Sequence, residues 1–128
     1  MRNMSFRHTK KQILEQTKTV TRRLGWRFLK RFDLVQPVER TMGLKKGEKV
    51  KKLGPPIRIV SVRREWLWDM KKEDVAREGF KGFTLAKFMY LFCRINDCEV
   101  DQEVTRIEFE YTKPSEAKEA KPRQKEGG

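Results

Sequence analysis

The stretch EVTRIEFEY, residues 103–111, is the clearest structural signal in the sequence. From Thr105 onward, Thr, Ile, Phe and Tyr occupy every second position, and Arg106, Glu108 and Glu110 lie between them. Successive side chains of a strand point to opposite faces of the sheet. The pattern therefore predicts an antiparallel strand with one face on the core and the other in water.

Three earlier stretches also predict strands. Residues 57–62 are rich in β-branched side chains, which is typical of a buried strand. Residues 32–38 alternate in character, and Pro37 within them indicates an edge position or a bulge, because proline cannot donate to the ladder. Residues 18–24 contain Thr and Val and predict a turn that leads into a strand.

Three helices accompany these strands. Thr9 with Gln12 three residues later has the form of a capping box, and predicts a short helix through residue 16. Residues 73–78 predict a second helix, which Gly79 ends in the left-handed conformation. Thr84 is expected to cap the third. Its apolar stripe consists of Leu85, Phe88, Phe92 and Ile95.

The order of these elements predicts one α+β domain over residues 1–112. It favours a small, mostly antiparallel β-barrel with two or three peripheral helices. Residues 41–56 contain five lysines and form a loop long enough to be functional or mobile. Residues 113–128 contain no large apolar side chain, so we expect a disordered basic tail there.

The charge balance favours a polyanionic partner. The 128 residues carry 31 Lys and Arg against 18 Asp and Glu, a net charge of +13. Only +2 of this falls in residues 113–128, so +11 belongs to the predicted domain. Such a charge attracts nucleic acid, whereas the alternative is that it only keeps a small domain soluble. No segment pairs a basic face with a broad apolar face, so no membrane partner is expected.

The cysteines indicate neither a disulfide framework nor a metal centre. Cys93 and Cys98 are too few for a disulfide scaffold, and with the single His8 they do not supply the four ligands of a structural zinc site. No glycine-rich phosphate loop occurs. We therefore expect a cytoplasmic monomer with free thiols, no metal and no cofactor.

The segment KTVTRR, residues 18–23, places two hydroxyls and three cations directly after the first helix. In a regular strand Lys18 and Thr21 would lie on opposite faces. A turn at Lys18 would break this alternation and bring the two side chains together. The pattern alone favours an ordinary basic edge strand.

Residues 22–32, RRLGWRFLKRF, interleave cations with aromatic rings. Cations that meet phosphates, beside rings that stack on bases, suit the binding of single-stranded nucleic acid. The alternative, which the pattern favours for Phe28 and Phe32, places those rings in the core and leaves Trp26 near the surface. The candidate nucleic-acid contacts are Arg22, Arg23, Trp26, Arg27, Lys45, Lys46, Lys51, Lys52, Arg63 and Arg64.

Several pieces of the sequence, in this order, resemble ASCH-domain proteins, which are small relatives of the PUA fold. The pieces are KTVTRR at 18–23, DLVQPVER at 33–40, IRIVSVRRE at 57–65, DVAREGF at 74–80 and EVTRIEFEY at 103–111. The resemblance covers roughly residues 4–111 and is greatest to short phage-type members. It implies a twisted β-barrel whose cleft faces nucleic acid, RNA above all, or a nucleobase.

Some small bacterial members of that family are amidohydrolases that deacylate N4-acetylcytidine. By motif position, the resemblance implies Lys18, Thr21 and Glu78 as the catalytic set. Glu65 and Glu73 are rival acids. The sequence departs from the family where Gln16-Thr17 stands in place of the usual glycine before the Lys-Thr motif. Glu78 also has a structural interpretation, as a helix-end carboxylate paired with Arg77 or Lys81.

The chemistry of such a set is coherent. In this set the Thr21 hydroxyl would attack the acyl carbon once a base takes its proton, and Lys18 can serve as that base if neighbouring cations and burial lower its pKa. Arg22 and Arg23 supply the cations and stabilise the oxyanion. Glu78 returns the proton to the leaving amine.

Two functions therefore stay open. One is a nucleic-acid-binding domain with a basic cleft, and the other is an amidohydrolase that acts on a modified nucleoside. A basic groove open at both ends favours the first. A closed pocket of nucleobase size above Thr21 favours the second.

Overall fold

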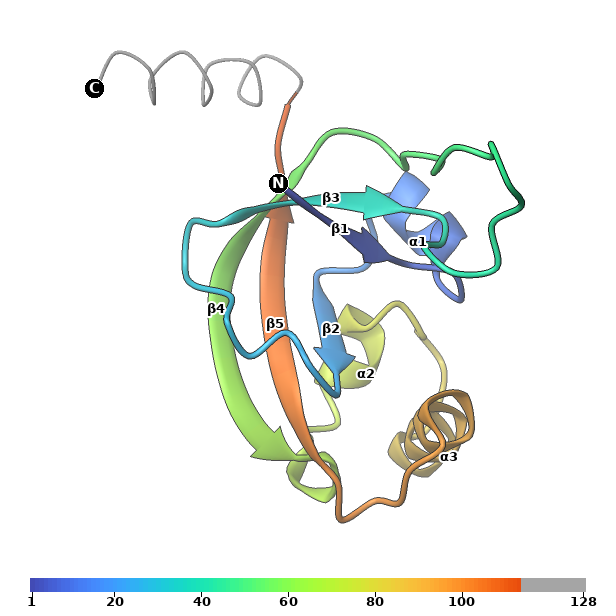
Figure 1. Ribbon diagram of the computed structural model, residues 1–128. Helices are drawn as coiled ribbons and strands as arrows, with labels where there is room; N and C mark the ends of the chain where they lie inside the picture. Colours follow the sequence, from blue (N-terminus) through green and yellow to red (C-terminus); the bar gives the residue numbers. More distant parts are fainter. Residues whose placement is uncertain (114–128) are drawn as a thin grey trace.

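A computed structural model describes residues 1–113 of the chain (Figure 1). Apart from Lys113, the tail expected to be disordered lies outside the described residues. The elements in chain order are β1 (Arg2–Ser5), α1 (Lys10–Leu14), β2 (Val20–Arg23), β3 (Leu34–Val38), β4 (Ile57–Trp66), the 3-10 helix η1 (Leu67–Asp69), α2 (Asp74–Arg77), α3 (Leu85–Asn96) and β5 (Glu103–Tyr111).

The five strands form one mixed sheet in the order β1-β3-β4-β5-β2. The β1–β3 pair is parallel, and the other pairs are antiparallel. The α+β class is as predicted, but the closed barrel is wrong, since the sheet does not close. The two edge strands do not pair with each other: β1 pairs with β3, β2 pairs with β5, and both edge strands contribute residues to one pocket, Ser5 and Thr21.

Pro37 lies in β3, which is an inner strand and not the edge predicted from proline. Its missing N–H interrupts no bond with β4, because the β3–β4 register covers only Leu34 and Val35. Beyond that point the lysine-rich loop takes the place of β4. Leu53 donates its N–H to the Pro37 carbonyl at 2.9 Å.

Two apolar cores pack against the sheet. The larger one is built around β1, β3, β4 and β5, with Ile107 and Phe109 of β5 in it. The second joins η1, α2 and α3 to Val104 of β5. The sequence pattern predicts that the face of β5 that carries Arg106, Glu108 and Glu110 is exposed to water. This is wrong for the N-terminal half of the strand, where Val104 and Arg106 on that face are buried against the helices.

The helix termini follow the sequence signals in part. The Thr84 hydroxyl accepts a hydrogen bond from the Lys87 N–H at 3.1 Å, which confirms the cap of α3. Thr9 precedes α1, but its side chain forms no capping bond, because its backbone (ψ 32°) is not extended as such a cap requires. Within residues 1–113, no helix has the length and apolar character needed to cross a membrane.

Gly79 ends α2 and brings its backbone against α1. Its φ is +99°, in the region that favours glycine, and a Cβ there would lie 2.8 Å from Cγ of Gln12. Gln12 in turn donates its side-chain amide to the Gly79 carbonyl at 3.0 Å. This contact sets the position of Glu78, the residue just before it.

We expect Gly79→Ala to lower the free energy of unfolding by about 1–3 kcal/mol more than Gly82→Ala. Both glycines have a positive φ, but a Cβ at Gly82 meets nothing within 4 Å, so the difference measures the clash with Gln12 alone. Urea unfolding followed by circular dichroism gives both values. Equal losses in the two variants would show that the close approach does not constrain the chain.

Candidate functional site

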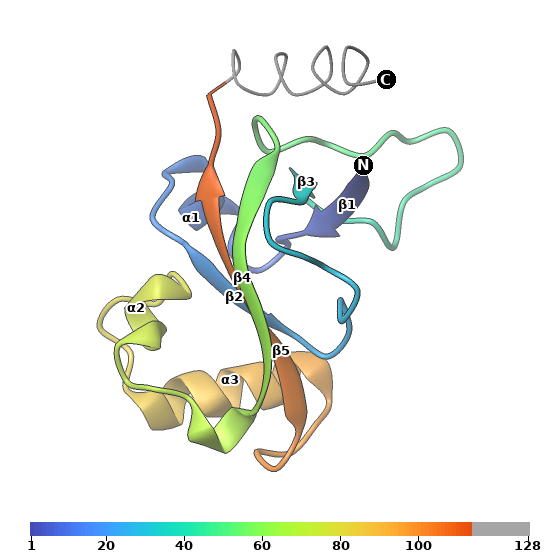
Figure 2. The ribbon, with the colours of Figure 1, turned by 90° about the vertical axis from the view of Figure 1, so that its left-hand side faces the viewer.

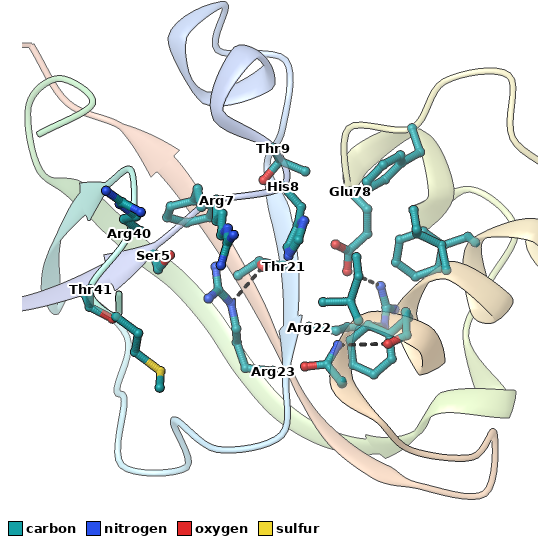
Figure 3. Close-up of a pocket in the computed structure, with 18 residues that line it drawn as sticks. Ser5, Arg7, His8, Thr9, Thr21, Arg22, Arg23, Arg40, Thr41 and Glu78 are labelled. Atoms are coloured by element: carbon teal, nitrogen blue, oxygen red, sulfur yellow. Dashed lines mark hydrogen bonds and ion pairs between the residues drawn. The ribbon is translucent and has the colours of Figure 1, made fainter. Parts of the chain in front are cut away.

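A pocket of about 370 Å³ is lined by residues of both edge strands, β1 and β2, and of α3. Residues 5–9, which end β1 and follow it, form one side together with residues 40–42 (Figure 3). Residues 21–23 of β2 lie in the middle, and Glu78, Phe80 and one face of α3 form the opposite side. The pocket therefore gathers segments from both ends of the chain around β2.

Lys18 and Glu78 meet in the buried interior. Lys18 Nζ donates to the Glu78 carboxylate at 2.9 Å and to the Glu78 backbone carbonyl at 2.6 Å. Both side chains are nearly inaccessible to solvent, at 3% and 4% exposure. The structure thus brings together two of the three residues that the resemblance implied as catalytic.

The local backbone explains this convergence. β2 begins only at Val20, so Lys18 lies before the strand and is not bound by its alternation. The Tyr111 hydroxyl donates to the Lys18 carbonyl, and the Thr19 N–H donates to the Arg77 carbonyl at 2.8 Å. The first bond joins the entry of β2 to the end of β5, and the second joins it to the end of α2.

Burial lowers the pKa of Lys18 below its usual value. The charge of Glu78 and its hydrogen bond oppose this shift, and the nearby cations of Arg23 and Arg22 add to it. The direction is the one that a lysine base needs, because lowering the pKa raises the fraction of neutral amine.

Thr21 lines the same pocket and is itself 3% exposed. Its Oγ1 accepts a hydrogen bond from Arg23 Nε at 3.1 Å. The Arg23 guanidinium in turn lies over the Phe6 ring, with its carbon 4.8 Å from the centroid. Burial lowers the pKa of Arg23 to about 10, against the charge of Glu78. The Thr21 hydroxyl is thus bonded to a cation on its own strand, whereas Lys18 Nζ bonds to Glu78.

Arg22 connects three carboxylates from two other elements. Its guanidinium donates to Glu78 at 3.0 Å, to Glu65 at 2.9 Å and to Asp74. The side chain is 0% exposed, so the Arg22 cation holds these carboxylates and does not face solvent. Glu65, one of the rival acids, therefore lies on Arg22 and not on Lys18, and Glu73 is exposed ahead of α2.

Asp74 is a central residue of the site that sequence reasoning missed. It also accepts from Arg106 Nε at 2.7 Å and from Arg77 Nη1 at 3.0 Å. Arg77 is therefore paired with Asp74 and not with Glu78. The sequence did contain a signal for this role of Asp74. Residues 74 and 78 are four apart and share one face of a helix, where two carboxylates repel each other unless cations from another element pair with them. The pocket residues of 5–9 carried no such signal.

The other predicted nucleic-acid contacts are spread over the surface. Arg64 donates to Glu103 at 3.0 Å and to Thr105, and Arg63 is exposed beside Glu65. Arg27 is exposed and Trp26 is half-buried in the loop between β2 and β3. The remaining four are exposed lysines of the loop whose first residues, 40–42, line the pocket: Lys45, Lys46, Lys51 and Lys52.

No group of three or more potential metal ligands occurs within residues 1–113. Cys93 and Cys98 are half-buried free thiols near the end of α3.

No family model matches the sequence, and no curated protein does. Solved structures that are similar include the hypothetical protein PH0355, at 14% identity and a TM-score of 0.58, over 85% of this chain and 94% of that one. An ASCH domain from Lactobacillus crispatus has 17% identity and a TM-score of 0.57, over 85% of this chain and 77% of its own. Protein EF3133 from Enterococcus faecalis, assigned to DUF984, has 13% identity and a TM-score of 0.55, over 83% of this chain and 73% of its own. The chain therefore has an ASCH-type fold.

We expect the stability of the protein to fall in acid, in large part through Asp74. Burial alone would raise the pKa of Asp74, but hydrogen bonds from Arg106, Arg22 and Arg77 outweigh it and lower that pKa below the usual value. A depressed folded-state pKa means that the stabilisation is present above about pH 4 and is lost as the pH falls through the folded pKa.

The test is Asp74→Asn, which leaves Arg22 and Arg106 without a shared counter-charge. We expect a loss of about 3–5 kcal/mol at pH 7 and a flatter dependence on pH below 4, measured by urea unfolding across the acid range. Asp101→Asn, at an exposed position, is the control. An acid limb as steep in Asp74→Asn as in the wild type would contradict this assignment.

Proposed function

We propose that the protein binds single-stranded nucleic acid, RNA in particular, by taking one nucleotide unit into the pocket beside Thr21 and Glu78. The observation that carries this proposal is the pocket itself, whose 370 Å³ lies in the range of small-ligand sites. It combines aromatic walls, a buried carboxylate and a cationic rim. A base fits the interior, and its phosphate fits the rim.

The interior offers groups that suit a base. Phe80 and Phe88 line it, with ring centroids 5.5 Å apart, and make this part of its wall apolar and aromatic. The Glu78 carboxylate, held by Lys18 and Arg22, accepts hydrogen bonds from the N–H groups of a base edge. The chemistry of the pocket thus favours a planar aromatic ligand that has N–H donors along its edge.

The rim offers groups that suit phosphate. Arg7 and His8 are exposed there, and Arg40 lies on the same side, at the start of the lysine-rich loop. The exposed lysines of that loop continue the positive surface away from the pocket. Cations in this position support binding to a backbone that extends beyond the bound nucleotide.

We expect Lys45→Gln with Lys46→Gln to weaken binding of a labelled single-stranded RNA evenly across sequences, because phosphates carry no base identity. The slope of log affinity against log salt concentration should become shallower by roughly 0.7 for each contact removed. Fluorescence anisotropy at several salt concentrations measures both quantities.

The matched control is Lys71→Gln with Lys72→Gln, which removes the same charge from exposed positions ahead of α2. Equal effects of the two double variants would mean that net charge alone drives binding. Absence of binding at low salt would refute the proposal.

The contact between Lys18 and Glu78 supports a second candidate, an amidohydrolase that acts on N4-acetylcytidine-like nucleosides. In this reaction the Thr21 oxygen bonds to the acyl carbon as the amide C–N bond breaks. The hydroxyl proton passes to neutral Lys18 and, through Glu78 at 2.9 Å, to the leaving nitrogen. Water then cleaves the acyl ester of Thr21 and restores the hydroxyl. Arg23, which donates to Thr21, is the candidate for stabilising the oxyanion.

We expect Thr21→Val, which keeps the shape and removes the hydroxyl, to abolish release of cytidine from N4-acetylcytidine. Lys18→Met should lower the rate by about 10²–10⁴, the usual contribution of a general base. Chromatography of substrate and product measures turnover. Thr19→Ala, outside the residues that line the pocket, should leave the rate unchanged. No turnover by the wild type, or full activity of Thr21→Val, would rule this reaction out.

A further inference from the structure

Residues 24–33 form the loop between β2 and β3 (Figure 2). This loop exposes the aromatic rings that the sequence pattern favoured for the core. Phe28 is 50% exposed and Phe32 is 68% exposed, whereas Trp26 is half-buried. The core interpretation is therefore wrong for both phenylalanines. The reason is that Leu29, at 7% exposure, fills the interior beneath the loop with part of Trp26 packed against the same core, whereas Phe28 and Phe32 are exposed.

The backbone holds these rings in place. The Phe32 N–H donates to the Ile59 carbonyl at 2.8 Å, and the Ile59 N–H donates to the Asp33 carbonyl at 2.9 Å. The Asp33 carboxylate accepts from the Lys30 N–H at 2.9 Å. The loop is thus tied to β4 and closed by its own turn, so the backbone that carries Phe32 is fixed in place.

Two of the aromatic residues have a backbone conformation that bulky side chains avoid. The φ of Trp26 is +63° and that of Phe32 is +77°. Burial does not offset the strain at Phe32, because most of its ring is in water. A strained residue that gains no packing is a mark of a functional position.

Cations accompany each exposed ring. The Arg2 guanidinium carbon lies 4.3 Å from the Phe28 ring centroid, and that of Arg31 lies 4.8 Å from the Phe32 centroid. The Trp26 and Phe28 rings are 5.3 Å apart and inclined by 34°. Exposed Arg27 and Lys30 add two more positive charges.

We propose that this surface is a second contact for single-stranded nucleic acid, in which bases stack on the rings and phosphates meet the cations. The aromatic–basic loop, as we name it, comprises Trp26, Phe28 and Phe32 with Arg2, Arg27, Lys30 and Arg31. Rings beside cations favour unpaired bases over a duplex, whose bases are already stacked, and over an apolar protein partner, which gains nothing from the cations. This inference extends the proposed function beyond the pocket but rests on separate residues.

The aromatic–basic loop continues directly from the pocket. β2 ends at Arg23, which lines the pocket, and Trp26 follows three residues later. The Cα atoms of these residues are therefore at most about 11 Å apart. A single strand with one nucleotide in the pocket thus has the stacking surface within reach of its neighbouring nucleotides.

The test uses a short single-stranded RNA that contains 2-aminopurine, whose fluorescence falls when it stacks. We expect Phe28→Ala and Phe32→Asn each to weaken binding about tenfold and to reduce the quenching. Asparagine tolerates a positive φ, so Phe32→Asn removes the ring without adding strain. Trp68→Ala, which removes a ring that is 54% exposed in η1, is the matched control and should bind as the wild type does. Arg31→Glu provides a second test if a ring variant fails to fold, and should weaken binding and flatten its salt dependence.

Unchanged affinity and quenching in Phe28→Ala, Phe32→Asn and Arg31→Glu would overturn the inference. So would equal binding of a duplex of the same sequence, or self-association by sedimentation that the ring variants abolish, since the surface would then serve a protein contact. Titration with nucleoside monophosphates separates this inference from the pocket. If they do not bind but the ring variants still weaken RNA binding, the pocket proposal fails and the aromatic–basic loop stands. If the nucleoside monophosphates bind equally to all variants and the RNA affinity of the ring variants is also unchanged, the aromatic–basic loop proposal fails and the pocket proposal stands.

Discussion

The arrangement of this protein depends on the buried guanidinium of Arg22. It lies on β2 and donates to Glu65 of β4 and to Asp74 and Glu78 at α2, while its side chain is 0% exposed. A buried cation is tolerated only when its charge and hydrogen bonds are matched, and so are the carboxylates around it. This requirement docks the short helix α2 against β2, although four helical residues have little stability of their own.

The same requirement shapes the candidate site. With α2 fixed, Glu78 faces Lys18 on one side and Arg22 on the other, and its carboxylate forms part of the pocket wall. Stability and site chemistry therefore share one set of charges. A change at Asp74 affects the pocket through Arg22, even though Asp74 is not among the residues that line it. The effects of substitutions within this network on the free energy of unfolding should not be additive, because each residue shares partners with the next.

The open edge of the sheet has a functional consequence. In a closed barrel the two edge strands, β1 and β2, would pair with each other. Instead β2 pairs only with β5, and its other edge borders the pocket. The strand then continues into the aromatic–basic loop. One continuous stretch, from Thr21 to Phe32, thus contributes residues to both candidate contacts for nucleic acid.

The sequence by itself determined four of the five strands and the helices α1, α2 and α3, since period-two and helical patterns and the Thr84 cap are local properties. It also indicated Lys18 and Glu78, through a motif and a helix end. It did not indicate β1 (Arg2–Ser5). Only the tertiary structure decided that the sheet stays open, that Pro37 lies inside it, and that Phe28 and Phe32 face water. Asp74 and Arg106, 32 residues apart, meet for the same reason. Hydrophobicity marks a residue as able to be buried, but which residues are buried depends on how the elements pack, and no local pattern contains that information.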